Sequence, residues 1–108
     1  IDMRRRIHRR PELGLHLPET QQTVLEAIDG LGLEVDTGDE CSWVVATLDS
    51  GKPGPTMLLR GDMDALPMPE DTGLDYASEI DGAMHACGHD AHTAMLASPA
   101  RRATTAPR

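Results

Sequence analysis

One short stretch of the sequence concentrates most of its metal-binding side chains. Residues 84–96, MHACGHDAHTAML, contain one cysteine, three histidines and one aspartate, in a chain of 108 residues that has only two cysteines and five histidines. A single glycine separates Cys87 from His89, and this spacing lets a turn direct a thiolate and an imidazole at one point. Such a pair suits Zn²⁺, with Co²⁺, Ni²⁺ or Mn²⁺ as alternatives.

Two ligands alone do not hold a metal ion, and the sequence offers several ways to complete the set. His92 follows His89 by three residues on the same helical face, so these two histidines could pair instead. His85, Asp90 and the carboxylates of DMDALP (residues 62–67) could bind the ion directly or orient a ligand through hydrogen bonds to its ring nitrogens.

Taken singly, each histidine is typical of a surface or capping residue, and a lone cysteine of a small buried hydrophobe. Clustered beside an acidic stretch, however, these residues favour a metal site. Burying several titratable groups side by side costs free energy unless an ion or a proton network joins them. His8 and His16 lack such neighbours in the sequence, and we expect them to be surface or capping residues.

Composition and charge exclude several classes of partner. The formal net charge is −8, and residues 61–90 contain no lysine or arginine, so this stretch should attract cations and a nucleic-acid partner is not expected. No stretch approaches the length of a membrane span, and no signal peptide opens the chain. Two isolated cysteines fit a reducing compartment, so we expect a soluble, cytoplasmic protein. The first residue is Ile1, which suggests that the N-terminus is incomplete.

The pattern of apolar residues predicts an α/β fold of one domain. A helix should end before Pro11, and a second should run from Pro18 to Leu31, because its apolar residues recur at helical spacing and Gly32 suits its C-terminal cap. Residues 41–48 and 56–62 are short and apolar and predict two strands joined by a turn-forming loop.

The second of these strands should be central, because Met57, Leu58 and Leu59 make it apolar on both faces. It would deliver Asp62 and Asp64 at its C-terminal end, where open α/β sheets usually bind ligands. Residues 68–82 predict a loop, and a helix should follow from about residue 90 to residue 96, broken at Pro99.

Three other kinds of chemistry are not supported. Cys87 and His89 lie so close in sequence that their side chains converge more readily on a third atom than on each other, which argues against a cysteine nucleophile with a histidine base. The stretch GKPGPT lacks the spacing and the Lys-Ser/Thr ending of a phosphate-binding loop. A redox CxxC motif is absent from the sequence.

Three motifs, in this order and at these separations, resemble a known family: RRIHRRPELGL, LLRGDMDALPMPEDTGLDYAS and GAMHACGHDAHTAML. The chain is similar, from its start to about Ala97, to the N-terminal part of the metal-dependent amidohydrolases and peptidases that include hippurate hydrolase, the indole-acetyl-amino-acid hydrolases and the aminoacylases. The resemblance implies hydrolysis of N-acyl amino acids or small peptides. It also implies a catalytic domain with a mixed β-sheet flanked by helices, interrupted by a smaller lid and dimerisation domain.

The resemblance also assigns roles to individual residues. A pair of divalent metal ions would polarise the scissile carbonyl and activate a water molecule. Cys87 would bridge the metals, His89 would be a terminal metal ligand, and Asp64 would be the catalytic-site carboxylate that orients a ligand. Asp62 stands where relatives of another branch have a metal-binding histidine, so the cysteine-containing, amidohydrolase-like branch is the better match.

The chain departs from the family in its last residues. The family's general base, a pair of glutamates, and its later histidine ligands would lie beyond residue 108. Residues 98–108, rich in Ala, Pro, Arg and Thr, do not match, and we expect a disordered, aberrant tail after a catalytic-domain portion of residues 1–97. The hypothesis is a truncated or frameshifted fragment, inactive alone and able to self-associate. The alternative is a non-catalytic metal-binding or interaction module left by truncation.

Overall fold

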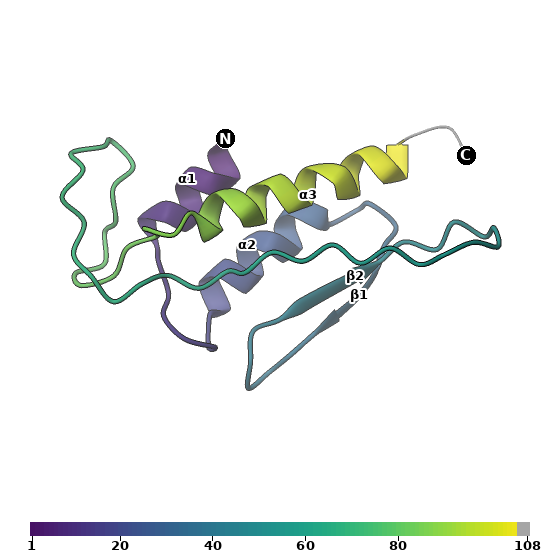
Figure 1. The fold of residues 1–108 in the computed structure, drawn as a ribbon, viewed down its shortest axis with the longest axis horizontal. Helices are drawn as coiled ribbons and strands as arrows, with labels where there is room; N and C mark the ends of the chain where they lie inside the picture. Colours follow the sequence, from purple (N-terminus) through teal and green to yellow (C-terminus); the bar gives the residue numbers. More distant parts are fainter. Residues whose placement is uncertain (106–108) are drawn as a thin grey trace.

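Three helices and one short hairpin make up the regular structure of residues 1–105, the part of the chain that the computed structural model describes (Figure 1). The elements are, in chain order, α1 (Asp2–Arg9), α2 (Pro18–Ile28), β1 (Glu34–Thr37), β2 (Val44–Thr47) and α3 (His89–Thr105). The predicted α/β class is confirmed, and residues 68–82 form the predicted loop without helix or strand.

The first two helices lie close to where the sequence predicts them. Helix α1 ends before Pro11, and α2 starts at Pro18 but ends at Ile28, three residues before the predicted end. The carboxylate of Glu12 caps α2, because it accepts hydrogen bonds from the backbone N–H groups of Glu19 (3.1 Å) and Thr20 (2.7 Å). This satisfies two of the helix's first N–H groups and ties the α1–α2 connection to the helix it introduces.

Strands β1 and β2 form an antiparallel hairpin in which Glu34 pairs with Thr47 and Thr37 with Val44. Strand β2 lies within the predicted strand 41–48, whereas the sequence analysis did not predict β1. Gly38 is required at the turn, because a Cβ there would collide with the Trp43 indole. Helix α2 contacts the hairpin, and the Gln21 side chain donates to the backbone carbonyls of Gly38 and Trp43.

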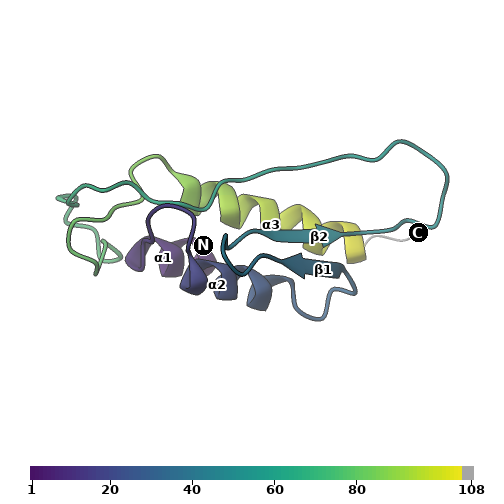
Figure 2. The ribbon, with the colours of Figure 1, turned by 90° about the horizontal axis from the view of Figure 1, so that it is seen from below.

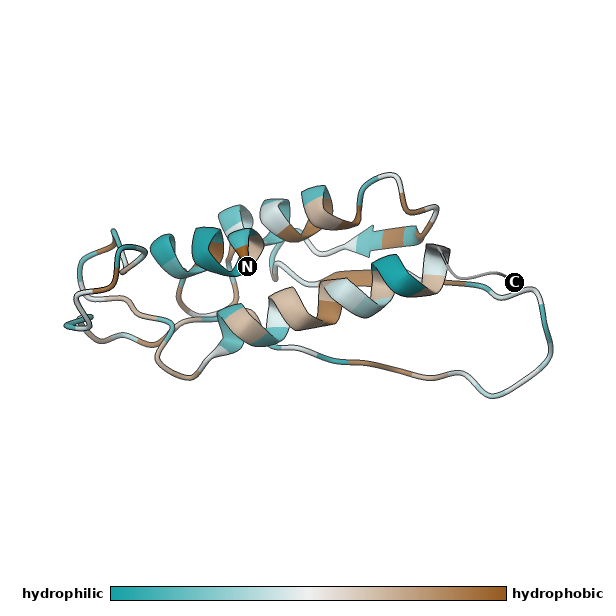
Figure 3. Ribbon diagram, turned by 90° about the horizontal axis from the view of Figure 1, so that it is seen from above, coloured by the Kyte–Doolittle hydropathy of each residue, from teal (hydrophilic) through white to brown (hydrophobic). Residues whose placement is uncertain are grey.

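The prediction that residues 56–62 form a central strand is wrong. This segment is extended and runs back along the molecule, as Figure 2 shows, but it forms no ladder with any strand in residues 1–105. Met57 and Leu58 are 83% and 85% exposed, and Figure 3 shows the apolar stretch along this open path. An apolar pattern predicts a buried strand only when a partner supplies backbone hydrogen bonds, and β1 and β2 pair with each other instead.

Helix α3 corrects a second prediction, that the helix breaks at Pro99. The helix continues through Pro99 to Thr105, so residues 98–105 are helical where disorder was expected, and residues 106–108 lie outside the described residues. Tertiary contacts explain the continuation, since α3 packs on α1 and α2 and Arg101 donates two hydrogen bonds to the carbonyl of Ala27. The domain boundary after residue 97 stays a prediction.

The core between these helices is small and largely polar. Among the residues whose burial the structure describes, five hydrophobic residues are buried, namely Ile7, Leu17, Ile28, Ala65 and Ala83. Seven polar or charged residues of the same part of the chain are equally buried, among them His8, His85 and Asp90. Specific polar pairing therefore has to position the elements as much as apolar burial does. None of the helices in residues 1–105 is long and apolar enough to cross a membrane.

We expect Pro99→Ala to stabilise the chain by roughly 1–3 kcal/mol, because a proline inside a helix removes one hydrogen bond and crowds the preceding turn. Urea unfolding followed by circular dichroism at 222 nm measures the effect. Ser98→Ala, the neighbouring exposed position in the same helix, is the control and should change stability far less. Loss of helicity in Pro99→Ala would contradict the continuous helix.

Candidate metal centre

Asp64 and His89 lie together although they are 25 positions apart in the sequence. The Nδ1 atom of His89 is 3.0 Å from Asp64 Oδ1 and 3.0 Å from the Asp64 carbonyl oxygen. Both oxygens accept, so Nδ1 carries a proton, and Nε2 is the ring nitrogen that remains for a ligand. The two side chains are 19% and 43% exposed, which leaves this end of α3 open to a ligand.

Two short bridges hold the segment that carries Asp64. The backbone N–H of Ala65 donates to the Glu12 carbonyl, and Leu66 exchanges two backbone hydrogen bonds with Met84. Further along α3, the Thr93 hydroxyl donates to the backbone carbonyl of Asp62 at 3.1 Å. The start of α3 is therefore fastened to residues 62–64 at two points one turn apart.

Asp62 itself faces a different partner. Its carboxylate forms an ion pair with Arg60 at 2.6 Å and is 40% exposed. Relatives in another branch of the family that the sequence resembles have a metal-binding histidine at this position. In this chain the position holds a carboxylate that is already paired with Arg60.

Cys87 is an exposed free thiol two residues before His89. Between them, Gly88 has φ +85°, a left-handed conformation that L side chains rarely adopt. The Gly88 carbonyl accepts from the backbone N–H groups of Ala91 and His92, which starts α3. The exposed His92 ring lies 5.9 Å from that of His89, centre to centre. Among residues 1–105, no three metal-binding side chains converge, so the metal roles of Cys87 and His89 stay predictions.

His8 is buried, which corrects the expectation that it is a surface or capping residue. Its Nδ1 lies 2.8 Å from Asp90 Oδ2 and its Nε2 lies 3.1 Å from Glu70 Oε1. Arg4, one turn earlier on α1, donates to the same Asp90 oxygen at 3.1 Å, and Tyr76 meets the His8 ring edge-on. No local pattern marks His8, because its partners lie 62 and 82 residues away.

Both carboxylates that face His8 are held in the ionised form. Burial alone would raise the pKa of Asp90, but hydrogen bonds from His8, the Ala91 backbone and Arg4 outweigh it and lower the pKa. Burial likewise opposes ionisation of Glu70, whose pKa is lowered by hydrogen bonds from Thr72, the Ser78 backbone and His8.

His85 lies beside this cluster, with its ring centre 6.3 Å from that of His8. It is 4% exposed, and neither ring nitrogen has a hydrogen-bond partner among the described residues. Burial lowers the pKa of His85, so the ring is neutral at pH 7. His85 was predicted as a possible metal ligand or orienting residue, and it lies in the interior beside His8.

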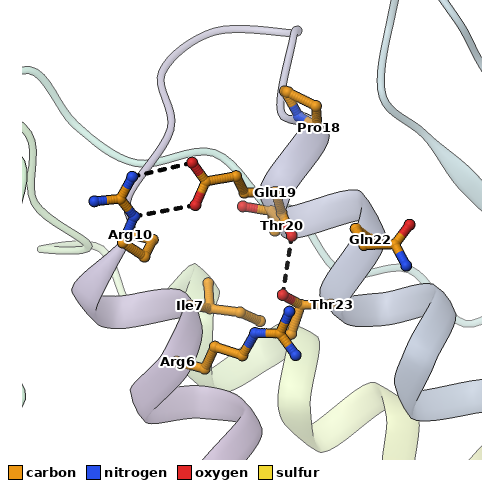
Figure 4. A pocket seen from close by; sticks show the side chains of 8 residues that line it. All are labelled: Arg6, Ile7, Arg10, Pro18, Glu19, Thr20, Gln22 and Thr23. Carbon is orange, nitrogen blue, oxygen red and sulfur yellow. Dashed lines mark hydrogen bonds and ion pairs between the residues drawn. The ribbon is translucent and has the colours of Figure 1, made fainter.

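A cavity lies elsewhere, between α1 and α2, as Figure 4 shows. It has a volume of about 270 Å³ and is lined by Arg6, Ile7, Arg10, Pro18, Glu19, Thr20, Gln22 and Thr23. Its two guanidinium groups are already paired, Arg10 with Glu19 in a two-bond contact and Arg6 with Glu26. This cavity includes none of the predicted metal-binding residues.

Comparisons with known proteins confirm the predicted family resemblance. Residues 58–106 match the family described as Peptidase family M20/M25/M40. Thermostable carboxypeptidase 1 of Saccharolobus solfataricus is 47% identical over 97 residues, which are 89% of this chain and 25% of that protein. The N-acyl-L-amino acid amidohydrolase of Geobacillus stearothermophilus is 43% identical over 102 residues, 94% of this chain and 27% of that protein.

The fold has a solved counterpart. The Bacillus subtilis YXEP protein, described as a dinuclear metal binding peptidase from the M20 family, superimposes with a TM-score of 0.88 at 36% identity. The match covers 95% of this chain and 29% of that one. This chain thus spans about a quarter of the length of the curated relatives it matches.

The buried carboxylates predict how stability depends on pH. The folded pKa values of Asp90 and Glu70 are lowered from the ordinary 3.8 and 4.5, so their contribution is complete above about pH 4.5 and is lost as the pH falls further. The free energy of unfolding in urea, measured between pH 3 and pH 7, should therefore drop steeply at the acid end. Glu70→Gln should flatten this drop, whereas Glu34→Gln on the exposed strand β1 should not. Parallel curves for all three proteins would contradict a stabilising role for the ionised carboxylate of Glu70.

Proposed function

This chain belongs to peptidase family M20/M25/M40, and we propose on that basis that it is the N-terminal part of a metal-dependent amidohydrolase. The substrates proposed are N-acyl amino acids or small peptides, and this chain alone is proposed to be inactive. The observation that carries the proposal is the hydrogen bond between Asp64 and His89, the residue two positions after the exposed Cys87.

The residues present fit a divalent metal ion as part of a donor set. Asp64 fixes the proton of His89 on Nδ1, which is the tautomer that offers Nε2 to a metal. Cys87 offers an exposed thiol two residues before His89, and sulfur with imidazole suits Zn²⁺, Co²⁺, Ni²⁺ or Mn²⁺. Cys87 and His89 would hold the metal, and the remaining ligands and the general base are proposed to lie outside these 108 residues.

Each residue has a distinct part in this proposal. A bound divalent pair supplies a Lewis acid that polarises the scissile carbonyl. Asp64 holds the His89 ring in one orientation and offsets positive charge on it when the other nitrogen binds a cation. The backbone hydrogen bonds of Ala65 and Leu66 hold the segment that carries Asp64, so its carboxylate keeps its position when a ligand moves. Gly88 lets the chain turn between the two donors.

A second candidate function is a non-catalytic metal-binding or interaction module. Two observations favour it: no third donor joins the pair within residues 1–105, and the apolar segment 56–60 is exposed. That segment would also support self-association through strand pairing. The proposed location for either function is the cytoplasm, since both Cys41 and Cys87 are free thiols.

Metal binding tests the site directly. Titration of the chain with Co²⁺, followed by the absorption of the thiolate–cobalt bond, should show one site that requires Cys87. Cys87→Ser should abolish this absorption, and His89→Ala should weaken binding by about tenfold or more, because each ligand adds both charge and preorganisation. Cys41→Ser is the matched control, as the only other cysteine, and should bind like the parent. A band that survives Cys87→Ser would refute the proposed site.

A chimera separates the enzyme from the non-catalytic module. Residues 1–97 of this chain would replace the matching part of the Geobacillus N-acyl-L-amino acid amidohydrolase, which supplies the rest of a catalytic domain. We expect hydrolysis of N-acetyl amino acids that chelators suppress, and a loss of at least about a hundredfold in kcat/KM with Asp64→Asn in the chimera. A folded chimera that binds metal without turnover would support the module instead.

A further inference from the structure

We propose that His8, together with Arg4, is a positioning residue for the Cys87–His89 pair and that it acts by holding Asp90 at the start of α3. The inference rests on the proposed function. It assigns a role in metal binding to residues of α1 that do not touch the donors.

His8 and Arg4 both contact the buried carboxylate of Asp90, and we refer to these two contacts as the clamp. The side chains of His8, Asp90 and Glu70 are 4%, 1% and 2% exposed, and the His8 ring lies between the two carboxylates with one nitrogen toward each. Arg4 reaches the same oxygen of Asp90 from the solvent side, with its own side chain 42% exposed. Three elements meet here: α1, the first turn of α3 and the loop 68–82.

Both nitrogens of the His8 ring face a buried carboxylate oxygen, Nδ1 that of Asp90 at 2.8 Å and Nε2 that of Glu70 at 3.1 Å. Hydrogen bonds to an ionised group are stronger than those between neutral groups, and burial strengthens them further. His8 thus fixes Asp90 in both distance and direction.

Asp90 transmits this constraint because it is the residue next to His89. Adjacent residues in a helix point about 100° apart, so the first turn of α3 presents Asp90 to α1 and His89 to Asp64. A rotation of that turn would move both side chains together. Releasing Asp90 would therefore free the His89 ring to depart from the position in which it and Cys87 reach one ion.

Two substitutions of His8 separate its two contacts. The amide nitrogen of Asn stands as many bonds from Cβ as Nδ1 does, so His8→Asn can keep the donor to Asp90 and lose the donor to Glu70. The amide nitrogen of Gln stands where Nε2 does, so His8→Gln keeps the donor to Glu70 and loses the one to Asp90. We expect Co²⁺ affinity within about threefold of the parent for His8→Asn and about tenfold or more weaker for His8→Gln. Equal affinities in the two variants would overturn the proposal.

A pair of arginine variants tests the clamp without disturbing the core. Arg4→Gln removes the second donor to Asp90 and should weaken Co²⁺ binding several-fold. Arg6→Gln, on the same helix, breaks only the exposed contact with Glu26 and should bind like the parent. Equal binding by both arginine variants counts against the proposal. If Cys87→Ser leaves Co²⁺ binding unchanged, it is the proposed function that fails.

Discussion

The buried carboxylate of Asp90 is the constraint on which the arrangement of this chain depends. It is completely buried, and an ionised carboxylate in that position destabilises the fold unless donors surround it. His8 and Arg4 both contact Oδ2 of Asp90, whereas Oδ1 has no hydrogen-bond partner among the described residues, so α1 and α3 can pack only in a register that brings these two donors to Asp90. With few buried hydrophobic side chains, this requirement selects one packing among several that apolar contact would allow.

Local signals predicted the elements whose causes are local. Pro18 and the helical spacing of its successors gave the position of α2, and Pro11 marked the end of α1. The prediction that the helix breaks at Pro99 failed, because tertiary contacts such as the one from Arg101 to the end of α2 offset the destabilising effect of the proline. The prediction of a central strand at 56–62 failed because tertiary contacts are missing there. The apolar pattern is typical of a strand that neighbouring elements cover, and no element of residues 1–105 covers this segment.

The residues of the candidate site were likewise predictable only where their signal is local or belongs to a family motif. Cys87 and His89 stand out in sequence because they are two positions apart, and the family motifs single out Asp64. The sequence predicted that a carboxylate of residues 62–67 could hydrogen-bond a ligand's ring nitrogen, and the resemblance singled out Asp64, but neither named His89 as its partner. His8 was misassigned because no cysteine, further histidine or acidic cluster lies near it in the sequence. Only the fold brings carboxylates to both of its nitrogens.

Among the histidine–carboxylate pairs of the described residues, His8–Asp90 and His89–Asp64 differ in one physical respect, access to water. The pair of His8 and Asp90 is sealed, with both ring nitrogens occupied, so it can neither bind a ligand nor exchange partners without local opening. The pair of His89 and Asp64 is partly open, with one nitrogen occupied and one free. His89 and Asp90 are consecutive residues, so the sealed pair fixes the backbone from which the open pair extends. A rigid attachment behind an accessible imidazole is what a metal ligand needs, because binding then costs little ordering of the side chain.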